Sequence, residues 1–151
     1  MSEFGVAFYS AICGLSVGLS FIANLLGGWN TSLETLLIFM AADYLTGLIC
    51  SLILKKSTKT ESGGYDSKVG IKGLLKKVGI LFMVLIAARL DMILNAGESN
   101  YVCTTVIIFF ITNEGLSVIE NLGIMGIPLP NIIKEAFCKL KSYDSLDNKD
   151  K

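Results

Sequence analysis

Histidine is absent from this 151-residue sequence. Its absence removes the side chain that most often acts as a general acid or base near neutral pH, and also the commonest protein ligand of metals. The four cysteines (Cys13, Cys50, Cys103 and Cys138) lie far apart, without a Cys-x-x-Cys pair. That spacing predicts neither a zinc site nor a disulfide framework. Because no other nucleophile or metal-ligand constellation is visible, we expect no enzyme activity, no metal and no cofactor.

Charged residues are scarce, at 17% of the chain against about 25% in a typical soluble domain. Hydrophobic residues make up 52%, and the mean hydropathy is +0.63. All twelve lysines lie in two blocks, 55–77 and 134–151, and Arg89 is the only other base. Such segregation is typical of an integral membrane protein and argues against a soluble four-helix bundle. The formal net charge is zero, and we expect no nucleic-acid partner.

The apolar residues gather into four segments of about the length that a membrane-crossing helix needs, roughly 20 residues. We predict an all-α integral membrane domain over 1–127 with four transmembrane helices, or three if the first segment lies on the surface or is re-entrant. Residues 128–151 are predicted to form a cytoplasmic tail with an amphipathic helix near its start. The predicted spans are about 4–26, 33–54, 78–94 (or from about Leu74) and 101–122, with a Lys-rich loop at 55–77.

The lysines also predict the orientation, because cytoplasmic loops carry an excess of Lys and Arg. The loop after the second span and the tail contain all the lysines, whereas the loops "GGWNTS" and "AGESN" contain none. We therefore expect a multi-pass protein of the bacterial cytoplasmic membrane with both termini in the cytoplasm. Within the lysine loop, Val69 to Lys77 is amphipathic enough to rest on the inner headgroups, where basic residues meet anionic lipid.

Small residues share one face of the first predicted span. Ala7, Ala11, Gly14 and Gly18 recur at intervals of three or four residues. A face of this kind lets two membrane helices approach closely. It has two interpretations, packing within the chain and self-association between copies.

Five strongly polar residues lie inside or near the ends of the apolar spans. Each costs about 2.5–3.5 kcal/mol at the centre of a span, and less near an end. Lone charges facing lipid are therefore implausible, and these groups are expected to have partners or to reach an interface. The five are Asp43, Arg89, Asp91, Glu114 and Glu120.

The polar residues of two spans fall on one helix face each. In the fourth span they lie within about 120° of arc at 100° per residue. Arg89 is the only base within a predicted span, so it is the predicted counter-ion of Asp43 or Glu114. Asp91 is expected to reach the outer interface, and Glu120 and Asn121 are expected to reach the inner one. The two faces either form a buried cluster that keeps the spans in register or line water once several copies assemble. They are Asn113, Glu114, Ser117, Glu120 and Asn121, and Asp43, Thr46, Gly47, Cys50 and Ser51.

Three stretches carry a resemblance to a known family. They are "GGWNTSLETLLIFMAADYLTGLI" (27–49), "SKVGIKGLLKKVGIL" (67–81) and "NEGLSVIENLGIMGIPLP" (113–130). Together they resemble phage holins of the toxin-secretion/phage-lysis type, which include clostridial toxin-export holins. The resemblance extends from about Gly27 to Leu140 and rests on the order of the motifs. The matching positions are Asp43, Tyr44, Thr46, Gly47, Gly70, Lys72, Gly73, Asn113, Glu114, Gly115, Ser117, Glu120, Asn121, Pro128 and Pro130.

The resemblance implies a lysis function without catalytic residues. Holins oligomerise in the cytoplasmic membrane and open lesions through which an endolysin, or in toxin-associated members a large protein toxin, crosses. The implied partners are other copies of the chain and the lipid bilayer, with the endolysin or toxin as cargo. Related holins are often described with three spans, which leaves the first segment open. The alternative is a small ion channel or transporter subunit with a fixed selective pore, although no filter motif is present.

Overall fold

The computed structural model describes residues 3–56, 64–94, 100–133, 135–136 and 139, with side chains from residue 5 onward. This part of the chain contains four long α-helices and no strand, which confirms the all-α prediction. Of the predicted amphipathic helix of the tail, residues 131–133, 135–136 and 139 are described, and they are helical. The helices are α1 (Glu3–Leu25), α2 (Thr31–Leu52), α3 (Ser67–Leu94) and α4 (Tyr101–Ile124).

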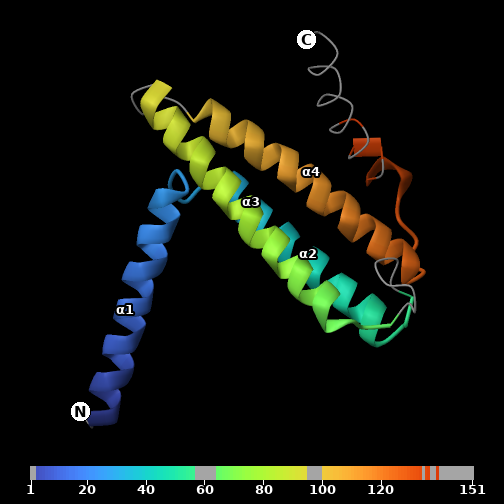
Figure 1. The fold of residues 1–151 in the computed structure, drawn as a ribbon, viewed down its shortest axis with the longest axis horizontal. Coiled ribbons are helices and arrows are strands. Elements are labelled where there is room, and N and C mark those ends of the chain that lie inside the picture. Colours follow the sequence, from blue (N-terminus) through green and yellow to red (C-terminus); the bar gives the residue numbers. More distant parts are fainter. Residues whose placement is uncertain (1–2, 57–63, 95–99, 134, 137–138, 140–151) are drawn as a thin grey trace.

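Helices α2, α3 and α4 form a bundle in which successive helices run in opposite directions (Figure 1). Helix α4 packs against both α2 and α3, and its contact with α2 is the more extensive. The bundle buries an apolar core at the level of the first half of α2 and the second half of α3, because those turns present small and branched side chains to one another. The core residues are Leu26, Leu33, Leu36, Met40, Ile80, Val84, Ala87, Ala88, Cys103 and Ile107.

Three helices are long and apolar enough to cross a membrane, namely Gly5–Leu25 of α1, α2 and α4. Helix α3 is not among them because Lys77, Arg89 and Asp91 all lie in its most apolar stretch. It also begins at Ser67, well before the predicted Val78. The second half of the segment predicted as a Lys-rich loop is therefore helical, and α3 continues the same axis without a break.

Helix α1 diverges from the bundle (Figure 1). Every side chain from Val6 to Ile22 is exposed, and α1 approaches only α3. A Cβ added at Gly14 or Gly18 would have no neighbour within 4 Å. The interpretation that the small-residue face packs within the chain is therefore wrong for this structure, and its role in self-association stays a prediction.

The turn between α1 and α2 is fixed by its backbone conformation and by hydrogen bonds, although α1 itself packs little against the bundle. Gly27 and Gly28 adopt φ values of +95° and +87°, a backbone region that side chains with a Cβ rarely occupy. The Asn30 side chain then accepts a hydrogen bond from the Leu33 amide at 2.9 Å, which caps α2. Arg89 of α3 donates to the Leu25 carbonyl at 2.9 Å, so the end of α1 is tied to the bundle.

The side chain of Asp91, on α3, caps the N-terminus of α4. Its carboxylate is fully buried and accepts hydrogen bonds from the amides of Val102 (3.0 Å) and Cys103 (2.7 Å). The first amides of a helix have no partner within that helix, and a negative charge is favourable at its positive end. The expectation that Asp91 reaches the outer interface is therefore wrong, because α4 supplies its partners inside the protein.

Removing this cap should destabilise the bundle measurably. We expect Asp91→Ala to lower the free energy of unfolding by about 1–3 kcal/mol, because it leaves buried donors without an acceptor. Asp91→Asn retains one acceptor oxygen and should cost less. The measurement is the thermal midpoint of the full-length protein in a neutral detergent. Equal midpoints for the alanine variant and the parent would show that the two amides find other partners.

Candidate functional site

Three charged side chains from three helices meet inside the bundle. The Lys77 Nζ of α3 lies 2.8 Å from Asp43 Oδ2 of α2 and also forms an ion pair with Glu114 Oε2 of α4. The residues are almost fully buried, with 8% of Lys77, 8% of Asp43 and 1% of Glu114 exposed. We call Asp43, Lys77 and Glu114 the ion cluster. It joins α2, α3 and α4 at one level.

An amide extends the ion cluster along α4. Asn121 Nδ2 donates to Thr46 Oγ1 at 2.9 Å and lies 3.4 Å from Asp43 Oδ1. The Thr46 hydroxyl in turn donates to the Ala42 carbonyl at 2.8 Å. Within the described residues, no fully buried side-chain nitrogen or oxygen lacks a hydrogen-bond partner. The polar groups of α2 and α4 are thus satisfied inside the bundle, with Lys77 of α3 pairing both carboxylates. The expectation that Asn121 reaches the inner interface is wrong, because Asn121 is buried in this network.

The charges of the ion cluster do not balance, because one ammonium faces two carboxylates. Lys76 partly offsets the excess, with its Nζ 4.0 Å from Glu114 Oε1 and 68% of its side chain exposed. Burying charges costs several kcal/mol per ion even when they are paired. The closed bundle therefore keeps a group of charges that water would solvate well.

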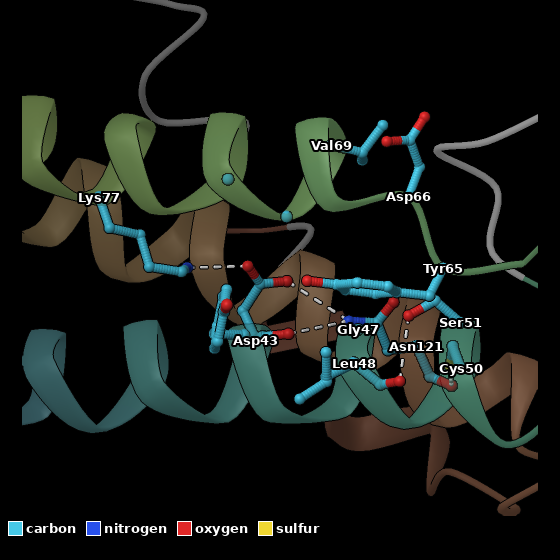
Figure 2. Close-up of a pocket in the computed structure, with 13 residues that line it drawn as sticks. Asp43, Gly47, Leu48, Cys50, Ser51, Tyr65, Asp66, Val69, Lys77 and Asn121 are labelled. Carbon is cyan, nitrogen blue, oxygen red and sulfur yellow. Dashed lines mark hydrogen bonds and ion pairs between the residues drawn. The ribbon is translucent and has the colours of Figure 1, made fainter.

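A pocket of about 80 Å³ opens beside the ion cluster. Figure 2 shows the ring of Tyr65, from the segment before α3, extending toward Asp43, with Asn121 beyond it. Glycines on α3 leave space for the pocket and for the Tyr65 ring. A Cβ at Gly73 would meet nothing within 4 Å, whereas one at Gly70 would lie 3.1 Å from the Tyr65 hydroxyl. The pocket is therefore large enough to admit water next to the buried charges.

The structure brings together four of the predicted site residues: Asp43, Thr46, Glu114 and Asn121. The other members of the α4 face are less enclosed. Asn113 and Ser117 are half-buried and Glu120 is exposed. The polar face of α4 therefore runs from the ion cluster to the surface of the bundle.

The predicted pairing of Arg89 with Asp43 or Glu114 is wrong. Arg89 lies about three turns beyond Lys77 along α3, near the Leu25 carbonyl and the Met92 sulfur. Lys77 takes the predicted place. It was missed because the lysines of 55–77 were all assigned to a loop, with the third span taken from Val78, although the alternative start at about Leu74 would have included Lys77.

A signal for Lys77 is nevertheless present in the sequence. It lies seven residues before Val84 and fourteen before Asp91, and all three are buried on one face of α3. Residues at this spacing share a helix face. Extending the apolar face of the third span toward the N-terminus would have placed Lys77 among buried residues.

Comparison with known proteins identifies the family. The family model of the bacteriophage holin family matches residues 20–142. The chain belongs to the bacteriophage holin family. Members are non-enzymatic membrane proteins. The match contains α2, α3 and α4 completely, and so contains every residue of the ion cluster.

Related proteins occur in bacteria and in a phage. An uncharacterized 14.9 kDa protein encoded beside nagH in Clostridium perfringens is 37% identical, over 77% of this holin-family chain and 81% of its own length. Another uncharacterized protein of C. perfringens strain 13 is 33% identical over 89% and 96%. A probable holin of Bacillus phage phi105 is 28% identical over 73% and 74%. No solved structure matches.

Proposed function

We propose that this holin-family protein oligomerises in the bacterial cytoplasmic membrane and forms lesions through which an endolysin reaches the cell wall. The observation that carries the proposal is the family match over residues 20–142. A large protein toxin is the second candidate cargo, because the sequence resembles toxin-export holins. Either cargo needs a hole wide enough for a folded protein rather than a filter for ions.

The ion cluster suggests how the protein changes from harmless to lytic. In the closed bundle Asp43, Lys77 and Glu114 satisfy one another away from lipid. If copies assemble and the helices separate, the same polar faces of α2 and α4 line water, where hydration replaces the lost pairings. The apolar outer faces stay against lipid in both states. The same polar residues would thus be buried between helices in one state and exposed to an aqueous hole in the other.

The topology follows from the same elements. We infer that α3 crosses the membrane as a fourth span, because it lies alongside α4, which is a candidate span. Its 28 residues measure about 42 Å at 1.5 Å per residue, close to the full thickness of a bilayer with its headgroups. Four spans place both termini in the cytoplasm, on the side of the lysines.

Helix α1 is the element that we propose for contacts between copies. It is apolar and exposed along most of its length. Its face of Ala7, Ala11, Gly14 and Gly18 suits close approach of another membrane helix. Contact with a second copy would occupy a face that the bundle leaves free.

A lysis assay tests the proposal directly. The chain is expressed from an inducible promoter in a bacterium, with and without a cytoplasmic muralytic enzyme that has no export signal. We expect the optical density to fall abruptly only when both are present. Cells that keep their density with both proteins would contradict the proposal; the enzyme alone is the control and should cause no fall. A small channel would instead depolarise the membrane without releasing the enzyme.

A further inference from the structure

The first turns of α3 carry a row of lysines beside a row of large apolar side chains. Lys68, Lys72 and Lys76 are four residues apart and exposed, so they follow one side of the helix. The apolar row next to them is exposed as well, although α3 is packed in the bundle on its other side. It consists of Ile71 (60% exposed), Leu74 (53%), Leu75 (64%) and Val78 (44%).

The apolar row continues down the rest of α3, which indicates what covers it. The exposed side chains further along are Phe82, Met83, Ile86, Leu90 and Ile93. A continuous exposed strip of this kind on a membrane protein faces acyl chains. The three lysines flank only the first part of the strip, so the surroundings of α3 change there from apolar to polar.

Helix length places that change at the edge of the hydrocarbon. Counting from Leu94 at 1.5 Å per residue, Lys76 lies about 27 Å along α3, Lys72 about 33 Å and Lys68 about 39 Å. The hydrocarbon core is about 30 Å thick and headgroups extend beyond it. Lys72 and Lys68 therefore fall in the headgroup layer, and Lys76 lies at its boundary. Lys77 lies at nearly the same depth as Lys76 but is buried on the bundle side of α3, where carboxylates rather than headgroups are its partners.

We propose that Lys68, Lys72 and Lys76 form a binding surface for the headgroup phosphates of anionic phospholipids, of the phosphatidylglycerol type. The charges are complementary, and the apolar row receives the acyl chains of the same lipids. Lys76 also faces Glu114 at 4.0 Å, so a bound phosphate competes with that carboxylate for the ammonium. The surface therefore connects the lipid composition of the membrane to the ion cluster. This assignment rests on the proposed membrane span of α3 but not on the lytic function.

The test is lipid binding by the purified full-length protein in a neutral detergent, followed by native mass spectrometry. Phosphatidylglycerol is the probe, and phosphatidylcholine with the same chains is the reference. We expect the parent to prefer phosphatidylglycerol. Lys68→Gln combined with Lys72→Gln should weaken phosphatidylglycerol binding about 30-fold and leave phosphatidylcholine binding unchanged. Lys76 is kept because of its contact with Glu114.

Two further variants separate this surface from charge in general. Arginine at both positions (Lys68→Arg with Lys72→Arg) should retain the preference, since arginine also binds phosphate. Lys55→Gln with Lys56→Gln removes the same charge just beyond α2 and should leave binding near that of the parent. Equal binding of the two lipids by the parent would overturn the proposal. So would unchanged binding by the Lys68/Lys72 glutamine variant, or an equal loss in the Lys55/Lys56 variant.

Discussion

Lys77→Met should destabilise the bundle strongly. Methionine keeps the length of the side chain but leaves Asp43 and Glu114 buried beside each other without their cation. Breaking a buried ion pair by removing one partner costs about 3–5 kcal/mol. Glu114→Gln should cost far less, because Lys77 keeps Asp43 at 2.8 Å and the excess negative charge is gone. The expected effect is therefore strongly asymmetric between the two partners.

Buried thiols provide the measurement. Cys50 and Cys103 are 2% exposed, so they react with a thiol-specific dye only when the bundle opens on heating, whereas Cys13 is already exposed. The matched control is the triple variant Asp43→Leu, Lys77→Met, Glu114→Met, which has no uncompensated charge and has the adjacent pocket as room for the leucine. It should recover the stability that Lys77→Met loses. Equal midpoints for Lys77→Met and Glu114→Gln would contradict the role assigned to Lys77.

The same triple variant should delay lysis, which is the largest functional effect that we expect. Replacing a buried ion cluster by apolar residues of similar volume stabilises a packed state by up to about 1–4 kcal/mol. In the open state the same residues would face water and lose the hydration that charges gain there. The equilibrium should shift toward the closed bundle by roughly fivefold to several hundredfold.

Lysis timing in the two-protein assay measures this shift. The triple variant should accumulate in the membrane to the level of the parent and trigger later or not at all. Arg89→Ala is the comparison variant and should trigger lysis near the parental time, because Arg89 lies away from the ion cluster, at the Leu25 carbonyl. If the triple variant lyses cells at the parental time, the charges serve only to hold the closed bundle together.

The sequence predicted the positions of the helices better than the residue pairs that form between them. Long apolar runs fix where α1, α2 and α4 lie, because a membrane helix has a nearly fixed length. The sequence also predicted that Asp43 or Glu114 pairs with a cation. It did not identify that cation. The spacing of Lys77 from Val84 and Asp91 indicates that Lys77 is buried, but which carboxylates it meets depends on the relative depth of three helices.

Two other residues show the same limit. Asp91 reads as an interfacial carboxylate when its helix is considered alone, but it caps the next helix across the α3–α4 connection. Lys77 reads as one of seven loop lysines that determine topology. Its inward direction follows only when the helix is extended back to Ser67. Both residues were misassigned because their partners belong to other helices.

The most direct test of the central proposal is the size of what escapes. Vesicles of bacterial lipid are loaded with a small dye and with a fluorescently labelled muralytic enzyme, and the purified full-length protein is reconstituted into them. The account predicts that enzyme and dye leave together once enough protein is present. Release of the dye while the enzyme stays inside would contradict it, and would point to a narrow pore with fixed walls.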